Sequence, residues 1–279
     1  MLKIMTRALI FSRCIWVLRQ NNSLSVLLRL IFSILLRQKG FFDLNVCGCN
    51  VRIRLRSPDL EVAVETLGRE FVGLSAVYPA DFNGLIVDAG GYIGTAAIAM
   101  SRMYPRATVV TLEPSSKNFE LLQSNVEDYP QIKPMKRALS LSNNQNLKLN
   151  DRGTGQWGFS VVQGKSVGVN TYIEDVDTIS LEKILLETGF EIVSLFKCDI
   201  EGAEKELLEN PGRAMVECPL IMIELHERIV VGCEKSFRDF SRNRLIVGTA
   251  GEKYLIVSKN YFENMGSSYL EQEDGVIAV

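Results

Sequence analysis

The chain has 279 residues, 47% of them hydrophobic and 23% charged, which is enough apolar material for a full hydrophobic core. Its formal net charge of −2 at pH 7 excludes bulk electrostatic attraction to nucleic acid, so we expect no nucleic-acid partner. The six cysteines lack the spacing of a secreted disulfide framework or of a four-ligand zinc site, which predicts free thiols, no metal and a cytoplasmic location.

Residues 1–40 form a basic, apolar segment without an acidic side chain. The polar residues in its second half recur every four positions, at Asn21, Ser25, Arg29, Ser33 and Arg37. On a helix this spacing gives one narrow polar stripe opposite a wide apolar face, and the longest apolar run is shorter than the roughly 20 residues of a membrane span. We predict a helical extension that packs on the domain or on a second copy, or lies on a membrane surface with which the chain is then associated; a cleaved signal peptide fits less well.

Residues 41–84 lead into the main domain. Apolar residues alternate with arginines between residues 51 and 56, which is the period of a half-exposed strand, and we expect Arg52, Arg54 and Arg56 to face solvent. A second interpretation places these arginines against an anionic substrate or a lipid surface. Residues 59–71 indicate a short helix that could form part of a lid over a cofactor.

The most informative stretch, residues 85–125, predicts two buried strands that alternate with two helices. The first strand ends at Asp88 and a glycine-rich turn, and a compact apolar run predicts the helix that follows. The second strand, residues 108–112, ends at Glu113, after which Pro114 opens the next helix. Such a βαβα unit predicts an α/β fold with a parallel sheet and right-handed crossovers.

The chemistry of this stretch lies in its turn and in the end of its second strand. The backbone of the turn can approach a ligand because it is rich in glycine, at Gly90, Gly91 and Gly94. Glu113 lies 25 residues beyond Asp88, where a carboxylate can accept both hydroxyls of a ribose, which predicts an adenosine-containing cofactor. Tyr92 replaces the second glycine of the dinucleotide fingerprint, and the Asp88 carboxylate would repel a pyrophosphate but favours an ammonium. These features favour S-adenosylmethionine over a nicotinamide or flavin cofactor.

The sequence contains, in this order, the motifs DAGGYIG, LEPSSKNFELLQSN and FKCDIEGAEKELL. Together they resemble the FkbM family of S-adenosylmethionine-dependent methyltransferases over residues 85–227, with one departure at Tyr92, where the family usually has Asn. The resemblance implies a class I methyltransferase fold, which is Rossmann-like, with a mostly parallel sheet and helices on both faces. It also implies S-adenosyl-L-methionine as cofactor and O-methylation of a hydroxyl on a sugar or other small molecule. The cofactor-binding residues implied in this way are Asp88, Gly90, Gly91, Tyr92, Gly94 and Glu113.

Residues 132–141 predict a third strand and its exit, and the resemblance implies that Ala138 lies near the adenine of the cofactor. Residues 142–170 are polar and rich in Asn and Gly, so we expect a hairpin or a loop insertion there. Trp157 and Phe159 in this insertion could line a substrate pocket or anchor the loop to the core.

The candidate catalytic residues follow two later strands. A helix is expected within residues 176–189, and the buried strand after it, residues 192–196, ends at Lys197, Asp199 and Glu201. Ligands in open α/β sheets bind beyond the carboxyl ends of strands, so Asp199 is a candidate proton acceptor or substrate-orienting group, and Lys197 could steady an oxyanion or pair with Asp199. Glu201 could also serve the site, and Asp199 and Glu201 could instead cap the next helix. The only histidine, His226, follows the strand at residues 220–223 and is a second candidate proton acceptor.

Residues 244–257 predict an antiparallel hairpin that closes the sheet. The expected organisation is therefore a helical extension at residues 1–40, a lead-in at 41–84 and a methyltransferase domain at 85–279, whose acceptor is a small hydroxylated molecule. Two other functions remain open. One is a non-catalytic methyltransferase-like module that acts through residues 1–40, and the other, which fits less well, is an NAD-dependent oxidoreductase.

Overall fold

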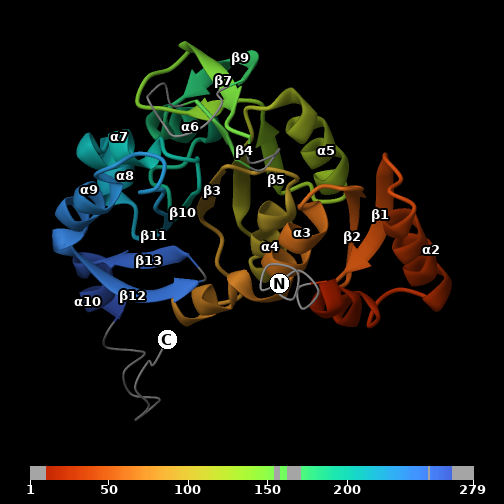
Figure 1. Cartoon of the computed structure of the whole chain (residues 1–279). Coiled ribbons are helices and arrows are strands. Elements are labelled where there is room, and N and C mark those ends of the chain that lie inside the picture. Colours follow the sequence, from red (N-terminus) through yellow and green to blue (C-terminus); the bar gives the residue numbers. More distant parts are fainter. Residues whose placement is uncertain (1–10, 154–157, 162–170, 251, 266–279) are drawn as a thin grey trace.

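The computed structural model describes residues 11–153, 158–161, 171–250 and 252–265 (Figure 1). Seven strands form the main sheet: β3 (Leu85–Ala89), β4 (Thr108–Leu112), β5 (Ile132–Met135), β10 (Leu195–Cys198), β11 (Leu220–Glu224), β12 (Arg244–Ala250) and β13 (Lys253–Ser258). Their order is β12-β13-β11-β10-β3-β4-β5. All neighbours are parallel except β13, which runs antiparallel to both β11 and β12. The predicted α/β fold, parallel βαβα unit and closing hairpin are confirmed.

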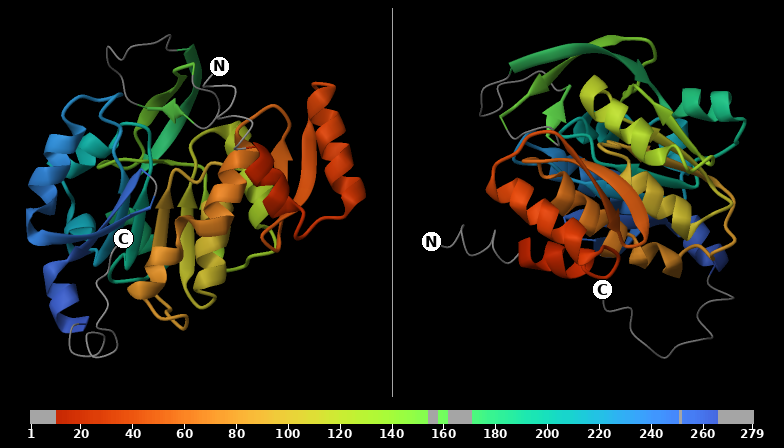
Figure 2. Two further views of the ribbon diagram at one scale, coloured as in Figure 1. Left: turned by 60° about the horizontal axis from the view of Figure 1, so that its bottom comes forward. Right: turned by 90° about the vertical axis from the view of Figure 1, so that its right-hand side faces the viewer.

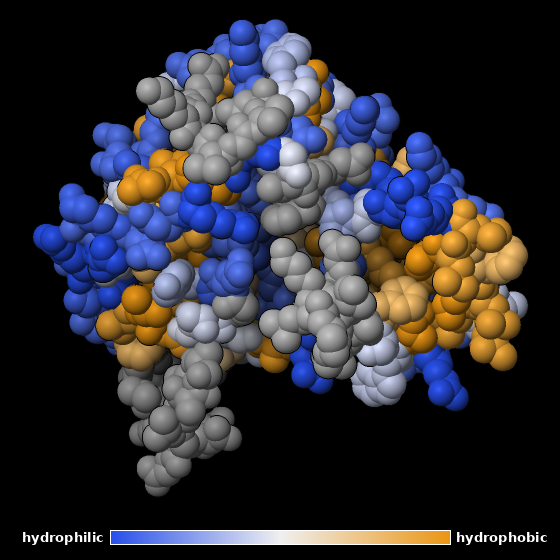
Figure 3. All heavy atoms as spheres, viewed as in Figure 1, coloured by the Kyte–Doolittle hydropathy of each residue, from blue (hydrophilic) through white to orange (hydrophobic). Residues whose placement is uncertain are grey.

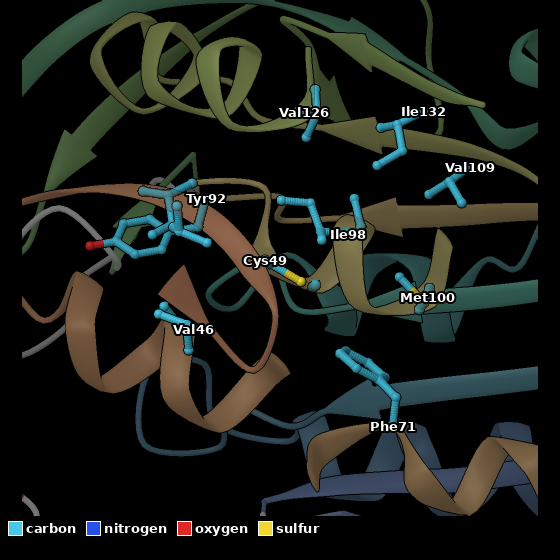
Figure 4. Close-up of a cluster of buried hydrophobic side chains, with 14 of the residues drawn as sticks. Val46, Cys49, Phe71, Tyr92, Ile98, Met100, Val109, Val126 and Ile132 are labelled. Carbon is cyan, nitrogen blue, oxygen red and sulfur yellow. The ribbon is translucent and has the colours of Figure 1, made fainter. Parts of the chain in front are cut away.

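The sheet is buried on both faces, and apolar side chains dominate its central strands. In β3, Ile86 belongs to one core, and its neighbours Leu85 and Val87 belong to the other. One face carries α3 (Asp59–Glu65), α4 (Thr95–Met103), α5 (Ser116–Val126) and α10 (Lys259–Met265). The other carries α6 (Leu181–Thr188), α7 (Glu204–Glu209), α8 (Arg213–Glu217) and α9 (Cys233–Phe240). Figure 4 shows part of the first core, to which Ile98 and Met100 of α4 and also Cys49 belong.

In the described part of the N-terminal extension, α2 (Leu24–Leu35) stands at one edge of the molecule (Figure 2). Residues 11–18 are helical, and α2 packs on a hairpin of β1 (Phe41–Val46) and β2 (Cys49–Arg54). Leu27 and Leu30 of α2 are buried, and Asn22 exchanges two hydrogen bonds with the backbone of Asn45. Within the described residues, no helix has the length and apolar character to cross a membrane.

Residues after the hairpin form α3, a π-helix (Thr66–Glu70) and a 3-10 helix (Val72–Ala76), in place of the single short helix predicted over residues 59–71. The prediction that all three arginines face solvent is wrong for Arg54. Its side chain is 12% exposed because its guanidinium binds both oxygens of the buried Asp59. Arg52 and Arg56 are exposed as predicted.

The insertion predicted after the third strand forms a small second sheet of order β6-β9-β7-β8. Its strands are β6 (Ala138–Leu139), β7 (Asn146–Asp151), β8 (Phe159–Ser160) and β9 (Thr171–Ile179). In Figure 1 this sheet lies above the main sheet. Trp157 and Phe159 are predicted to line a substrate pocket or to anchor this insertion. Trp157 lies outside the described residues, whereas Phe159 lies in β8.

Candidate active site

A cavity of about 530 Å³ opens beyond the carboxyl ends of β3, β4, β10 and β11, and its size suits a cofactor with a small substrate. The residues around it come from the glycine turn, the π-helix, the small sheet and the ends of β10, β11 and β13. Of the predicted site residues, seven line it: Gly90, Gly91, Tyr92, Glu113, Ala138, Lys197 and Asp199. The other three, Asp88, Gly94 and His226, do not.

The glycine turn packs directly on the end of β10. Gly90 has a φ of +86°, and a Cβ at this position would lie 1.8 Å from the backbone oxygen of Asp199. Only glycine permits both this conformation and this approach. The turn therefore places the first cofactor-binding candidates against the first catalytic candidate.

Asp88 and Lys197 form a buried ion pair under this turn. Lys197 Nζ lies 2.9 Å from Asp88 Oδ1 and donates to the backbone oxygen of Gly90, and Thr111 Oγ1 donates to Asp88 Oδ2. Burial lowers the pKa of Lys197, but Asp88 and Asp199 outweigh burial and raise the pKa above its usual value. Because both side chains are almost fully buried, Lys197 holds the turn to β10, and Asp88 lies beneath the cavity instead of at its surface.

Glu113 directly follows β4 at the cavity wall, as expected for a ribose-binding carboxylate. Its oxygens accept hydrogen bonds from the backbone N–H groups of Tyr92 and Ser115 and from Asn118 Nδ2. Burial raises the pKa of Glu113 to about 7, against the effect of these donors. The carboxyl group is therefore held in place and changes its charge near neutral pH.

Sequence reasoning missed the support behind this carboxylate. The Tyr92 hydroxyl donates to Asp59, and Arg54 lies over the Tyr92 ring with its Cζ 5.2 Å from the ring centroid. Arg54 Nη1 donates to Asn118, which in turn donates to Glu113. Figure 4 shows the Tyr92 hydroxyl pointing away from the apolar cluster. Tyr92 thus connects the glycine turn to the lead-in segment. In the sequence, only the alternation of arginines with apolar residues could have indicated that Arg54 contributes to this support.

His226 is 1% exposed, and its ring faces several carboxylates. His226 Nδ1 lies 2.9 Å from Glu204 Oε1, and Nε2 lies 3.4 Å from Glu224 Oε1, 3.6 Å from Glu201 Oε1 and 3.9 Å from Asp199 Oδ1. Burial lowers the pKa of His226, but the facing carboxylates of Glu204 and Glu224 outweigh burial and raise the pKa to about 10. A histidine with this pKa does not readily accept a proton at pH 7.

Asp199 differs from His226 because it is 23% exposed and lines the cavity. Lys253 Nζ lies 3.3 Å from Asp199 Oδ2, 2.8 Å from Glu224 Oε2 and 3.2 Å from Glu70 Oε1. Sequence reasoning missed Lys253 and Glu70, which come from the edge hairpin and the π-helix. Arg152 Nη1 and Ser160 Oγ donate to the backbone oxygen of Glu201 and so tie the small sheet to this acidic side of the cavity.

Three features define a class I methyltransferase domain. The sheet has seven strands with one antiparallel strand next to its edge, a glycine turn follows the central strand β3, and an acidic residue follows the adjacent strand β4. The family model described as the methyltransferase FkbM domain matches residues 88–245, more than half of the chain. The chain belongs to this family, as its three motifs predict. Class I methyltransferases use S-adenosylmethionine, so membership confirms the predicted cofactor class.

Two curated relatives are methyltransferases by name. Methyltransferase 1 of Beauveria bassiana (strain ARSEF 2860) is 28% identical over 164 residues, which cover 48% of this chain and 61% of that protein. Methyltransferase sdnD of Sordaria araneosa is 27% identical over 158 residues, which cover 46% of this chain and 60% of that protein. The chain thus spans about three fifths of the length of these relatives. Among solved structures, the fibrillarin pre-rRNA processing protein of Methanococcus jannaschii matches 69% of this chain and 77% of its own, with a TM-score of 0.40 and 11% identity.

Proposed function

We propose that the chain transfers a methyl group from S-adenosylmethionine to a hydroxyl of a sugar or other small hydroxylated molecule. One observation carries this proposal: Gly90, Glu113 and Asp199 come from three different strand ends and line one cavity. The first two are suited to the donor and the third to the acceptor.

The cavity residues fit the donor. Glu113 is held by three N–H donors at the cavity wall and can accept the ribose hydroxyls, and Ala138 offers an apolar surface to the adenine. Gly90 and Gly91 line the cavity along the turn, where the remainder of the molecule would lie. When bound, S-adenosylmethionine supplies an electrophilic methyl group on a sulfonium.

Asp199 is the residue best placed to accept the proton of the acceptor hydroxyl. Its carboxylate lines the cavity, whereas His226 is buried behind it and Lys197 is held by Asp88. As the hydroxyl oxygen bonds to the methyl carbon and the carbon–sulfur bond breaks, the hydroxyl proton passes to Asp199. Alignment of donor and acceptor by the cavity supplies most of the remaining rate enhancement.

The acceptor side of the cavity favours a polar molecule with several hydroxyls. Glu201, Glu224 and Lys253 line it together with Asp199 and offer both acceptors and a donor of hydrogen bonds. A cavity that reaches Asp199 and Lys197 also speaks against a non-catalytic module with a closed site.

The test is transfer of label from methyl-labelled S-adenosylmethionine into a set of monosaccharides and glycosides. We expect base-stable label in at least one acceptor, and a rate lower by about 10² to 10⁴ in Asp199→Asn because the proton acceptor is removed. Asp177→Asn, which makes the same change at an exposed ion pair with Arg137, should keep the wild-type rate. Donor binding without transfer to any acceptor would favour the non-catalytic module.

We also propose that the chain lies on an anionic membrane surface through the exposed face of α2. Four large apolar side chains at helical spacing form this face: Leu24, Leu28, Phe32 and Leu35, which are 72%, 57%, 60% and 74% exposed. Figure 3 shows hydrophobic side chains gathered over α2 at one edge of the molecule. Residues 1–40 carry seven basic and no acidic side chains. This positive charge favours an anionic lipid surface over a second copy of the chain as the partner of α2.

Sedimentation with vesicles tests this proposal. We expect binding to vesicles that contain phosphatidylglycerol and little binding to phosphatidylcholine alone, with loss of binding in Phe32→Glu. Leu186→Glu is the matched control, because Leu186 is 75% exposed on α6. A stable dimer in solution without vesicle binding would show that α2 serves self-association instead.

A further inference from the structure

The imidazole of His226 is buried with one nitrogen unsatisfied. Nδ1 is held by Glu204 at 2.9 Å, and within the described part of the chain Nε2 has no hydrogen-bond partner. A proton on Nε2 would face carboxylate oxygens at 3.4 to 3.9 Å, beyond the roughly 2.7–2.9 Å of a charged hydrogen bond. Within the described ranges, a proton on Nε2 therefore lacks an acceptor at the distance of a charged hydrogen bond.

The spacing around Nε2 is slightly wider than that of ligands bound to a metal ion. Ligand atoms at about 2.1 Å from a tetrahedral ion lie about 3.4 Å apart. Nε2 lies 3.4 Å from Glu224 Oε1 and 3.9 Å from Asp199 Oδ1, and the three ligand atoms of this group lie within 4.8 Å of one another. Small side-chain movements would bring all three within bonding distance of one ion.

Glu204 gives His226 the support that metal-binding histidines have. Glu204 Oε1 forms a hydrogen bond with His226 Nδ1 and also accepts one from the backbone N–H of Ile200. Glu204 Oε2 accepts a hydrogen bond from the backbone N–H of Gly202. When a cation displaces the proton on Nε2, a carboxylate fixed in this way holds the remaining proton on Nδ1 and leaves the lone pair of Nε2 directed at the ion. The backbone of Glu201, with a φ of +54°, also places a carboxylate 3.6 Å from Nε2 at the cost of local strain.

The acidic side chains described around the cavity outnumber the basic ones, which favours the binding of a cation. Six carboxylates converge on this region: Glu70, Asp88, Asp199, Glu201, Glu204 and Glu224. Among the described residues, the basic side chains facing them are Lys197, Lys253 and Arg152, besides the ring of His226 itself. Lys253 approaches Asp199 Oδ2 and Glu224 Oε2, so that the other oxygen of each carboxylate remains on the side of His226.

We infer that Asp199, Glu224 and His226 form a binding site for one divalent cation at the cavity wall. One imidazole and two carboxylates suit an ion such as Mn²⁺ or Zn²⁺ better than Mg²⁺, which prefers oxygen ligands in strict octahedral geometry. Three protein ligands leave positions open toward the cavity, because Asp199 and Glu224 line it. If the proposed function holds, the ion would bind the acceptor's hydroxyl oxygen there and lower its pKa, and the hydroxyl proton would pass to Asp199 Oδ2, the oxygen that does not face His226. The sequence alone predicted no metal.

Titration of the tag-free full chain with Mn²⁺, after treatment with a chelator, tests the inference. The electron paramagnetic resonance signal of free Mn²⁺ should report one bound ion per chain, with a dissociation constant of about 10⁻⁵ M or tighter. Because His226 is the only histidine in the chain, a ¹⁴N coupling from imidazole in the spectrum of bound Mn²⁺ assigns the site without any substitution. No binding at about 1 mM of either Mn²⁺ or Zn²⁺, or bound Mn²⁺ without nitrogen coupling, would overturn the inference.

Substitutions give an independent readout. Glu224→Gln should weaken Mn²⁺ binding at least about tenfold, and Glu204→Gln, which loosens His226, about 10- to 100-fold. Glu234→Gln neutralises an exposed carboxylate that pairs with Arg238 and should bind as the wild type does. Equal affinity in Glu224→Gln and the wild type would contradict the assignment. A separate titration with S-adenosylmethionine in the presence of a chelator distinguishes the two proposals. Cation binding without binding of S-adenosylmethionine overturns only the proposed function. Binding of S-adenosylmethionine without cation binding overturns only this site.

Discussion

The buried pair of Lys197 and Asp88 makes a quantitative prediction about stability. Lys197 is 3% exposed, Asp88 is 0% exposed, and their charged atoms lie 2.9 Å apart. Lys197→Met leaves the Asp88 carboxylate buried with the Thr111 hydroxyl but without a charge partner. Removal of one member of a buried pair costs roughly 3–5 kcal/mol, so we expect the free energy of unfolding to fall by that amount.

Thermal and urea unfolding followed by circular dichroism measure this loss. At about 2–4 °C per kcal/mol for a chain of this size, the predicted decrease in Tm is roughly 6–20 °C. Lys183→Met, which breaks an exposed pair with Glu187, should cost no more than about 0.5 kcal/mol. The double variant Asp88→Asn with Lys197→Met should recover part of the loss because no charge is left unpaired. A loss below about 1 kcal/mol in Lys197→Met would refute the reasoning.

Two further predictions concern the donor side of the cavity. Burial raises the pKa of Glu113 to about 7, and the ribose hydroxyls require the charged form of this carboxyl group. Affinity for S-adenosylmethionine, measured by calorimetry, should therefore rise about tenfold between pH 6 and pH 8. An unchanged Kd over this range would contradict the role of Glu113. Tyr92→Phe removes the hydrogen bond to the buried Asp59 and should lower the free energy of unfolding by about 1.5–3 kcal/mol in urea, whereas Tyr172→Phe, at a side chain 53% exposed, should leave stability unchanged.

The parts of the site that follow parallel strands could be predicted from the sequence. Gly90 and Glu113 come directly after β3 and β4, and parallel strands bring their carboxyl ends to one edge of the sheet. The same rule places Lys197 and Asp199 beside them after β10. Local pattern and topology together were sufficient for these residues.

The remaining site residues could not be predicted because their positions depend on packing between distant segments. Lys253 begins β13, an antiparallel strand whose register against β11 brings its ammonium to Glu224. Glu70 reaches Lys253 from a π-helix, and the period of the sequence does not distinguish this helix from an ordinary one. Arg54 looked like a solvent-facing residue because its partner Asp59 lies in another element.

The most direct test of the central claim is calorimetric titration of the purified chain with S-adenosylmethionine, S-adenosylhomocysteine and NAD. We expect one site for the first two ligands and none for NAD, with binding lost in Glu113→Gln and kept in Glu120→Gln, which makes the same change at an exposed residue of α5. Binding of NAD, or no binding of either sulfur-containing ligand by the wild-type chain, would contradict the account.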